Sequence, residues 1–192
     1  MSQYIFVRHG QSQYNAELTT NLDSNLTLFG EQQAIKTGIY LKNNFPDISE
    51  YVGITSPYHR CLQTSHIIHD ICGLFFQVKP GPREVMMSYD ECKVVNRKDK
   101  FGHFHWHHEE DFHFFNEDEI AFVSRMQSYI LAEEHPKLLV VSHGSPIRAM
   151  YDAVIGNPVF PDLHNYPDNC SVSHVKDKQG VYFNHIPWKG KL

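Results

Sequence analysis

The stretch Val7-Arg8-His9-Gly10-Gln11-Ser12 is the most informative part of the sequence. The apolar residues 4–7, which end just before Arg8, are typical of a buried strand. Gly10 permits a sharp turn or a close approach of the backbone to a ligand, and a helix is expected to begin soon after it. A helix start offers unpaired N–H groups to an anion, and the planar guanidinium of Arg8 matches phosphate oxygens.

The rest of the chain repeats this alternation of strand and helix. Apolar periodicity predicts helices over residues 29–44, 57–72, 117–134 and 146–155. Strands are expected at 51–55, 75–78 and 138–141, and a hairpin at 171–175 and 181–186. This α/β pattern predicts a three-layer α/β/α sandwich with a mostly parallel central sheet and an antiparallel edge strand. One domain is expected to span residues 1–192, with residues 80–115 forming a wall or cap over the active site.

Two further turns follow strands in the same way. In Ser56-Pro57-Tyr58-His59-Arg60, Ser56 is expected to cap the helix and Pro57 to begin it. Arg60 then lies in the first turn, where a cation is unfavourable against the helix dipole unless it faces an anion. The third turn is Ser142-His143-Gly144-Ser145-Pro146. Because parallel sheets bind ligands at the carboxyl ends of their strands, the three turns together predict a cage for a dianionic phosphoryl group.

Four segments resemble the signatures of the histidine phosphatase superfamily, the phosphoglycerate mutase-like proteins. The run from Val7 to Asn15 resembles its first histidine motif. Residues 26–34 resemble the L-T-x-x-G-x-x-Q-A helix start, residues 56–64 the S-P-x-x-R-x-x-Q-T helix start, and residues 141–144 the second histidine turn. The resemblance extends over nearly the whole chain.

The resemblance implies roles for individual residues. His9 would be the nucleophile that becomes phosphohistidine, and Glu84 in Pro82-Arg83-Glu84-Val85 would be the general acid. Asp90 and Glu91 are rival acids, because the residues after Glu84 depart from the family pattern. The residues expected to hold the phosphoryl group and line its pocket are Arg8, Gln11, Asn15, Arg60, His143 and Gly144.

Elementary chemistry agrees with these roles. A neutral imidazole can attack phosphorus and divide one difficult step into two. Arginines can supply the positioning and charge stabilisation that phosphoryl transfer needs, so no metal and no cofactor is expected. The leading prediction is a phosphatase for a small phosphorylated substrate. A mutase that passes the phosphoryl group to another substrate is the alternative, although the insertions expected of mutases are not evident.

Residues 101–115 contain five histidines among aromatic and acidic residues. His103, His105 and His107 alternate and would share one face of a strand, which would suit a metal. The spacing matches no recognised zinc motif, so a loop that contacts substrate is favoured. A protein that binds phosphate or metal with little catalysis is a third reading.

The composition narrows the class of protein. Hydrophobic residues make up 41% and charged residues 20% of the 192 residues, which is ordinary for a globular protein. A net charge of -5 gives no reason to expect a nucleic-acid or membrane partner. The four cysteines form no C-x-x-C pair and the chain starts without a signal-like segment, so a cytoplasmic location is expected. The oligomeric state is left open.

Overall fold

The computed structural model describes residues 1–84, 101, 103–106, 117–157 and 165–189. Its strands are β1 (Gln3–Arg8), β2 (Val52–Thr55), β3 (Phe76–Val78), β4 (His105–Trp106), β5 (Lys137–Ser142), β6 (Val172–Lys176) and β7 (Gln179–His185). Its α-helices are α1 (Leu28–Asn44), α2 (His59–Cys72), α3 (Glu119–Leu131) and α4 (Gly144–Ile155), with short 3-10 helices η1 (Ile48–Glu50) and η4 (Pro187–Lys189).

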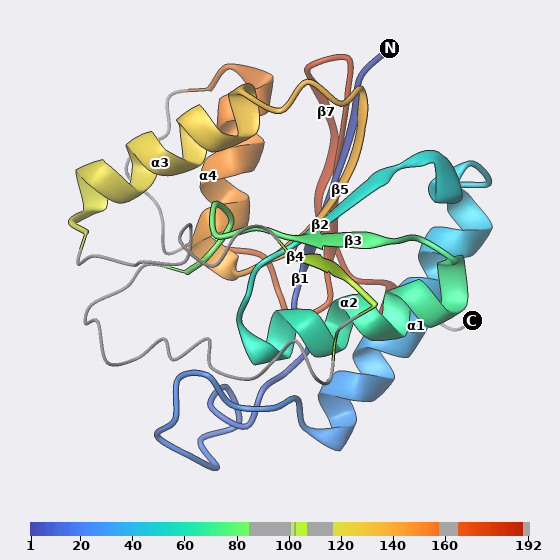
Figure 1. The fold of residues 1–192 in the computed structure, drawn as a ribbon, viewed down its shortest axis with the longest axis vertical. Coiled ribbons are helices and arrows are strands. Elements are labelled where there is room, and N and C mark those ends of the chain that lie inside the picture. Colours follow the sequence, from blue (N-terminus) through green and yellow to red (C-terminus); the bar gives the residue numbers. More distant parts are fainter. Residues whose placement is uncertain (85–100, 102, 107–116, 158–164, 190–192) are drawn as a thin grey trace.

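The strands form one sheet in the order β4-β3-β2-β5-β1-β6-β7. The first five strands in this order are parallel, whereas β6 pairs antiparallel with β1 and β7 with β6. Helices α1 and α2 pack together on one face of the sheet and α3 and α4 on the other (Figure 1). The predicted three-layer sandwich with an antiparallel edge is therefore confirmed.

The central strand β5 has a core on each side. Leu139 and Val141 belong to the apolar cluster on the α1–α2 side, and Leu138 and Val140 to the cluster on the α3–α4 side. All four are fully buried. Because alternate side chains of a strand point to opposite faces, a wholly apolar run indicates a strand covered on both sides. The carboxyl end of β5 is therefore buried inside the molecule.

Helix α1 begins as the sequence predicts, but the start of α2 does not. The Thr27 hydroxyl accepts a hydrogen bond from the Gly30 N–H and caps α1. Helix α2 starts at His59 with Tyr58 in the capping position. The prediction that Ser56 caps α2 and Pro57 begins it is therefore wrong, because the Ser56 hydroxyl is used in a buried contact with His143.

The helix expected soon after Gly10 is also absent: residues 13–17 form turns. The Ser12 hydroxyl accepts from the Asn15 N–H, and the Asn15 side-chain oxygen accepts from the Ser12 N–H. Short polar side chains compete in this way for backbone groups that a helix would use. Strand β4 was not predicted either, since two residues carry no periodic signal.

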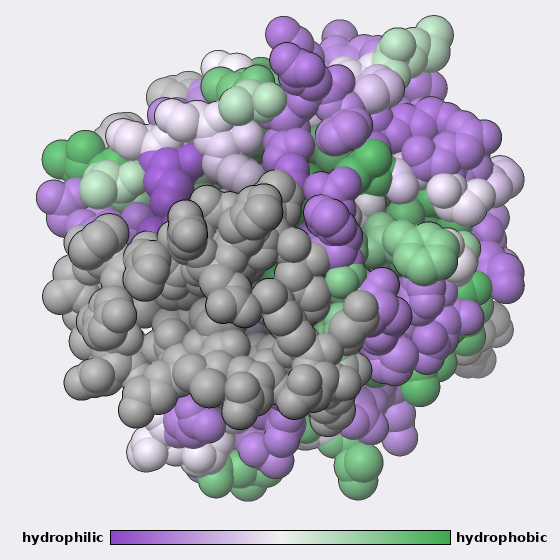
Figure 2. Space-filling model, in the orientation of Figure 1, coloured by the Kyte–Doolittle hydropathy of each residue, from purple (hydrophilic) through white to green (hydrophobic). Residues whose placement is uncertain are grey.

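The surface drawn in Figure 2 carries small apolar areas separated by polar residues, outside the atoms drawn in grey. Exposed large apolar side chains such as Phe29, Phe75 and Leu131 come from different elements. Single exposed apolar residues are normal on a protein surface. In the part of the chain that the structure describes, no helix is long and apolar enough to cross a membrane.

Candidate active site

Two histidines and an arginine form a buried chain of hydrogen bonds at the carboxyl ends of adjacent strands. His9 follows β1, His143 follows β5, and Arg60 lies in the first turn of α2, which follows β2. The Arg60 guanidinium donates from Nε to Nε2 of His9 over 3.1 Å and contacts Nδ1 of His143 over 3.0 Å. The exposed fractions are 2% for His9, 7% for Arg60 and 0% for His143, so this chain is removed from bulk water.

The hydrogen bonds determine which ring nitrogens carry hydrogen. Nδ1 of His9 lies 2.7 Å from the Gly10 carbonyl, which can only accept, so Nδ1 carries the hydrogen and Nε2 keeps its lone pair. Arg60 can only donate, so Nδ1 of His143 accepts from it. Nε2 of His143 then donates to the Ser56 hydroxyl over 2.8 Å.

Both imidazoles are held in the neutral form. Burial lowers the pKa of His9 well below its usual value, and the positive charges of Arg60 and Arg8 lower it further, against a smaller opposite effect of the Gly10 carbonyl. Burial and then Arg60 likewise lower the pKa of His143. A neutral imidazole with a lone pair on Nε2 is the nucleophilic form of histidine, and in His9 this lone pair accepts the hydrogen bond from Arg60.

Arg8 brings a second guanidinium to the same place. Its NH1 donates to the Pro167 carbonyl over 2.7 Å, and its guanidinium lies 5.1 Å from the centre of the Tyr166 ring. Its Nε is buried and has no hydrogen-bond partner among the described residues. Burial lowers the pKa of Arg8 and the nearby charge of Arg60 lowers it further, whereas Glu84 and Tyr166 act in the opposite direction. An anion placed between the two guanidiniums would offset both effects.

Glu84 lies beside this group. One of its carboxylate oxygens is 3.9 Å from Nδ1 of His143, and its side chain is 31% exposed. A partly exposed carboxyl next to the histidines is positioned to exchange protons with substrate or water. The rival acids Asp90 and Glu91 lie outside the described residues.

The other predicted site residues, Gln11, Asn15 and Gly144, lie outside the buried chain of hydrogen bonds. The Gln11 side-chain oxygen accepts from the Thr27 hydroxyl. The exposed Asn15 is joined to His9 through Asn169, whose amide donates both to the Asn15 side chain over 3.3 Å and to the His9 carbonyl over 2.9 Å. At Gly144 a Cβ atom would lie 2.9 Å from the Tyr166 side chain, so the close approach of Tyr166 requires the glycine.

Several residues of the site were not predicted. The Thr64 hydroxyl accepts from the Gly10 N–H and donates to the Arg60 carbonyl, so it joins the first turn to α2. Thr64 ends the S-P-x-x-R-x-x-Q-T segment, and this position was its signal. Tyr166 and Asn169 carried no sequence signal.

The first turn is also packed tightly against α1. A Cβ atom on Gly10 would lie 2.5 Å from the Gly30 carbonyl oxygen, and one on Gly30 would lie 2.1 Å from that of Gln11. The Gln33 side chain accepts from the Gln11 N–H. The two glycines therefore let α1 support the loop that carries His9.

The structure also bears on the candidate metal ligands and on the thiol of Cys61, which contacts His143. Of the candidate ligands His103, His105 and His107, the last lies outside the described residues. No three His, Cys, Asp or Glu side chains within the described ranges are arranged to hold a metal ion. Burial raises the pKa of the Cys61 thiol to about 12, which disfavours the reactive thiolate.

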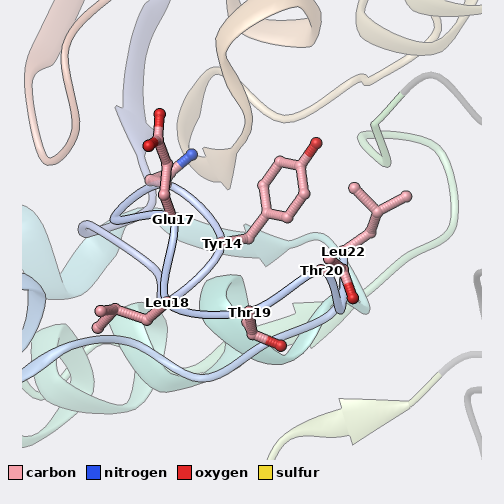
Figure 3. A pocket seen from close by; sticks show the side chains of 7 residues that line it. Tyr14, Glu17, Leu18, Thr19, Thr20 and Leu22 are labelled. Atoms are coloured by element: carbon pink, nitrogen blue, oxygen red, sulfur yellow. The ribbon is translucent and has the colours of Figure 1, made fainter.

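A pocket of about 920 Å³ lies beside the site on the loop that follows the first turn. The loop carries all of its lining, and the Tyr14 and Leu22 side chains point to the same side (Figure 3). The Leu22 carbonyl accepts from Arg60, so the pocket is joined directly to the buried chain. The lining residues are Tyr14, Asn15, Glu17, Leu18, Thr19, Thr20 and Leu22.

Comparisons with known proteins agree on the family. A relative from Enterobacter sp. (strain 638) named "Probable phosphoglycerate mutase GpmB" is 28% identical, covering 98% of this chain and 88% of its own. A relative of the same name from Escherichia fergusonii is 27% identical, covering 91% of this chain and 85% of its own.

Solved structures share the fold. A mycobacterial glucosyl-3-phosphoglycerate phosphatase matches with a TM-score of 0.67 and 18% identity over 96% of this chain and 100% of that one. The phosphoserine phosphatase of Entamoeba histolytica, solved with 3-phosphoglyceric acid, matches with a TM-score of 0.63 and 20% identity over 96% and 97%. The model of the histidine phosphatase superfamily (branch 1) matches residues 4–183, so the chain belongs to that superfamily.

Proposed function

We propose that this protein is a phosphatase that hydrolyses phosphate monoesters of a small substrate through a phosphohistidine on His9, without a metal. The observation that carries the proposal is the neutral Nε2 of His9, whose lone pair faces the Arg60 guanidinium in a buried site. Nucleophile and cation thus meet where an electrophilic, dianionic phosphoryl group would be attacked and neutralised.

The first step transfers the phosphoryl group to the enzyme. Nε2 of His9 forms a bond to phosphorus while the bond to the leaving oxygen breaks, and the protonated Glu84 gives its proton to that oxygen. The guanidiniums of Arg8 and Arg60 hold the remaining phosphoryl oxygens, and His143 positions the Arg60 guanidinium by accepting its hydrogen bond on Nδ1. The Gly10 carbonyl keeps the hydrogen on Nδ1 and so stabilises the positive charge that develops on the ring.

The second step returns the enzyme to its starting state. The Glu84 carboxylate takes a proton from water as the water oxygen bonds to phosphorus, and the bond from phosphorus to Nε2 breaks to release inorganic phosphate. Glu84 is again a carboxylic acid and His9 again neutral. The Glu84 side chain is 31% exposed, which supports this role because the carboxyl group must reach both substrate and water.

The pocket on the 14–22 loop is proposed to receive the organic part of the substrate. Its lining combines an aromatic ring, two leucines, two threonines and an amide with the carboxylate of Glu17. None of the described residues that line it is Lys or Arg. These residues favour an uncharged, hydroxyl-bearing or cationic group over a second anion.

A mutase is the second candidate, because relatives named probable phosphoglycerate mutase are similar to this protein over most of its chain. A mutase must bind the carboxylate of phosphoglycerate, which the Glu17 side of the pocket disfavours. Conversion of 3-phosphoglycerate measured with and without 2,3-bisphosphoglycerate separates the two. Bisphosphoglycerate-dependent isomerisation faster than phosphate release would replace the phosphatase assignment.

The deciding experiment traps the intermediate. The protein is reacted with nitrophenyl phosphate in EDTA, quenched with base, and digested. We expect steady nitrophenol release and an alkali-stable phosphate on the peptide that contains His9. No label and no turnover over a broad set of phosphate esters would favour a phosphate-binding protein with little catalysis instead, and inhibition by EDTA that metal reverses would overturn the metal-free mechanism.

A further inference from the structure

A group of histidines outside the active site joins helix α2 to the residues just before β4. Nδ1 of His66 lies 3.2 Å from Nε2 of His103, and the His69 ring centre lies 5.4 Å from that of His103. His66 and His103 are 37 positions apart in the sequence. The mechanism proposed above uses none of the three histidines. The segment that holds β4 runs alongside α2 (Figure 1).

His103 is held in place by its neighbours. Phe101 and Phe104 are 1% and 3% exposed and belong to the apolar core on the α2 side, and the His103 ring packs 4.3 Å from that of Phe104. Two buried anchors therefore fix the position of an exposed imidazole between them. A ligand atom that is already positioned loses less conformational entropy on binding.

His66 is oriented by a carboxylate. Its Nε2 lies 3.7 Å from Asp70, one turn further along α2, which favours the tautomer with hydrogen on Nε2 and a lone pair on Nδ1. A carboxylate on the outer nitrogen of a histidine is the usual support of a metal-binding imidazole.

The two nitrogens share a hydrogen bond, and an ion can take the place of the shared hydrogen when the hydrogen of His103 moves to its Nδ1. Two ligands of a tetrahedral zinc ion with Zn–N bonds of about 2.0–2.1 Å lie about 3.3–3.4 Å apart. The observed 3.2 Å is close to this value, and His66 is 44% exposed, so an ion can enter from solvent. Since no three described side chains can hold an ion together, water would complete the coordination.

We propose that His66 and His103 form a surface site for a divalent transition-metal ion such as Zn²⁺ or Ni²⁺. The ion ties residues 103–106 to α2. This site differs from a set of alternating histidines within residues 103–107, because His66 of α2 is indispensable to it. The inference does not depend on the proposed function, since binding is read without turnover.

The test uses the untagged full chain, stripped with EDTA and dialysed free of metal. Calorimetric titration with Zn²⁺ and Ni²⁺ is expected to show one ion bound per chain, with a saturable rise in Tm. His66→Ala and His103→Ala should each abolish this binding, whereas His135→Ala, an exposed histidine after α3, should leave it unchanged. Equal binding by wild type and His66→Ala, or no binding by wild type, would overturn the proposal.

A second variant guards against loss of folding. Asp70→Asn keeps both ligands and should weaken binding about tenfold through the orientation of His66, with the Tm of the metal-free protein unchanged. A Co²⁺ spectrum provides an independent readout, because its visible absorption reports imidazole ligation directly. A spectrum that persists unchanged in His66→Ala would place the ion elsewhere and sink the assignment.

Discussion

The imidazole of His9 shows how a single buried side chain acquires its chemistry from its neighbours. The Gly10 carbonyl fixes its tautomer, and burial together with two guanidiniums keeps it neutral. The same guanidiniums that disfavour an imidazolium would favour a dianion bound beside the ring. The positive charges of the site thus disfavour a proton on Nε2 of His9 and favour an anionic phosphoryl group next to that atom.

Replacement of His9 tests this directly. In His9→Ala the phosphoryl group has no acceptor, and we expect kcat for nitrophenyl phosphate to fall on the order of 10⁴-fold or more, as when other covalent nucleophiles are removed. The fold should persist, which circular dichroism and Tm will show. His135→Ala, away from the site, is the matched control, and near-normal turnover of His9→Ala would refute the nucleophile assignment.

Replacement of Glu84 tests the general acid. Glu84→Gln cannot give a proton to the leaving oxygen, so alkyl phosphates should slow by about 10²–10⁴-fold. Nitrophenyl phosphate, whose leaving group needs little protonation, should slow much less. The measurement is a series of kcat/KM values against the pKa of the leaving group, and an equal loss for all substrates would turn attention to Glu91.

At the scale of elements, the N-terminus of α1 acts as a support for the loop that carries His9. The contact depends on Gly30, since any Cβ there would collide with the Gln11 backbone. The capping Thr27 bonds to both the backbone and the side chain of Gln11. Residues 26–34, which contain Thr27 and Gly30, therefore affect the site by packing against the loop that carries His9.

A single methyl group at Gly30 should expose this dependence. Glycine to alanine in a helix ordinarily stabilises by about 0.5–1 kcal/mol, but Gly30→Ala should destabilise by about 1–3 kcal/mol, the usual cost of overpacking. It should also lower kcat, because the loop must move. Urea unfolding and turnover provide the check, with Gln32→Ala on the exposed side of α1 as control; a more stable and fully active Gly30→Ala would contradict the packing argument.

For the whole molecule, the buried neutral histidines couple folding to pH. His9 and His143 resist protonation in the folded state, whereas in the unfolded chain they take up protons near pH 6.5. The unfolded state then binds more protons, so the free energy of unfolding falls as pH decreases below about 7.

The expected slope is up to about 1.4 kcal/mol per pH unit for each histidine that stays neutral. Urea unfolding at pH 7.5, 6.5 and 5.5 measures it. His143→Gln cannot titrate at that position and should show a slope that is smaller by one histidine's share. A slope unchanged by this substitution would mean that other groups govern the acid limb.

The sequence allowed the layers, the strand ends and the converging Arg8, His9, Arg60 and His143 to be predicted, because strand and helix periods and short turn motifs are local signals. The contact of Ser56 with His143 was not predictable. A serine hydroxyl can either cap a helix or bind a distant side chain, and the local sequence does not distinguish the two. The pairing of His66 with His103 depends on a two-residue strand that has no period. Where the organising contact is long-range, the local pattern is ambiguous.

The position of β5 between β2 and β1 has a consequence for how the protein is made. Ribosomes produce β1 and β2 well before Lys137–Ser142, so the edges of β1 and β2 that face β5 stay unpaired until β5 is made. During this interval the nascent chain has no assembled site and exposes apolar strand edges, which are prone to aggregation. The candidate site is therefore assembled late in synthesis, when the last third of the chain emerges.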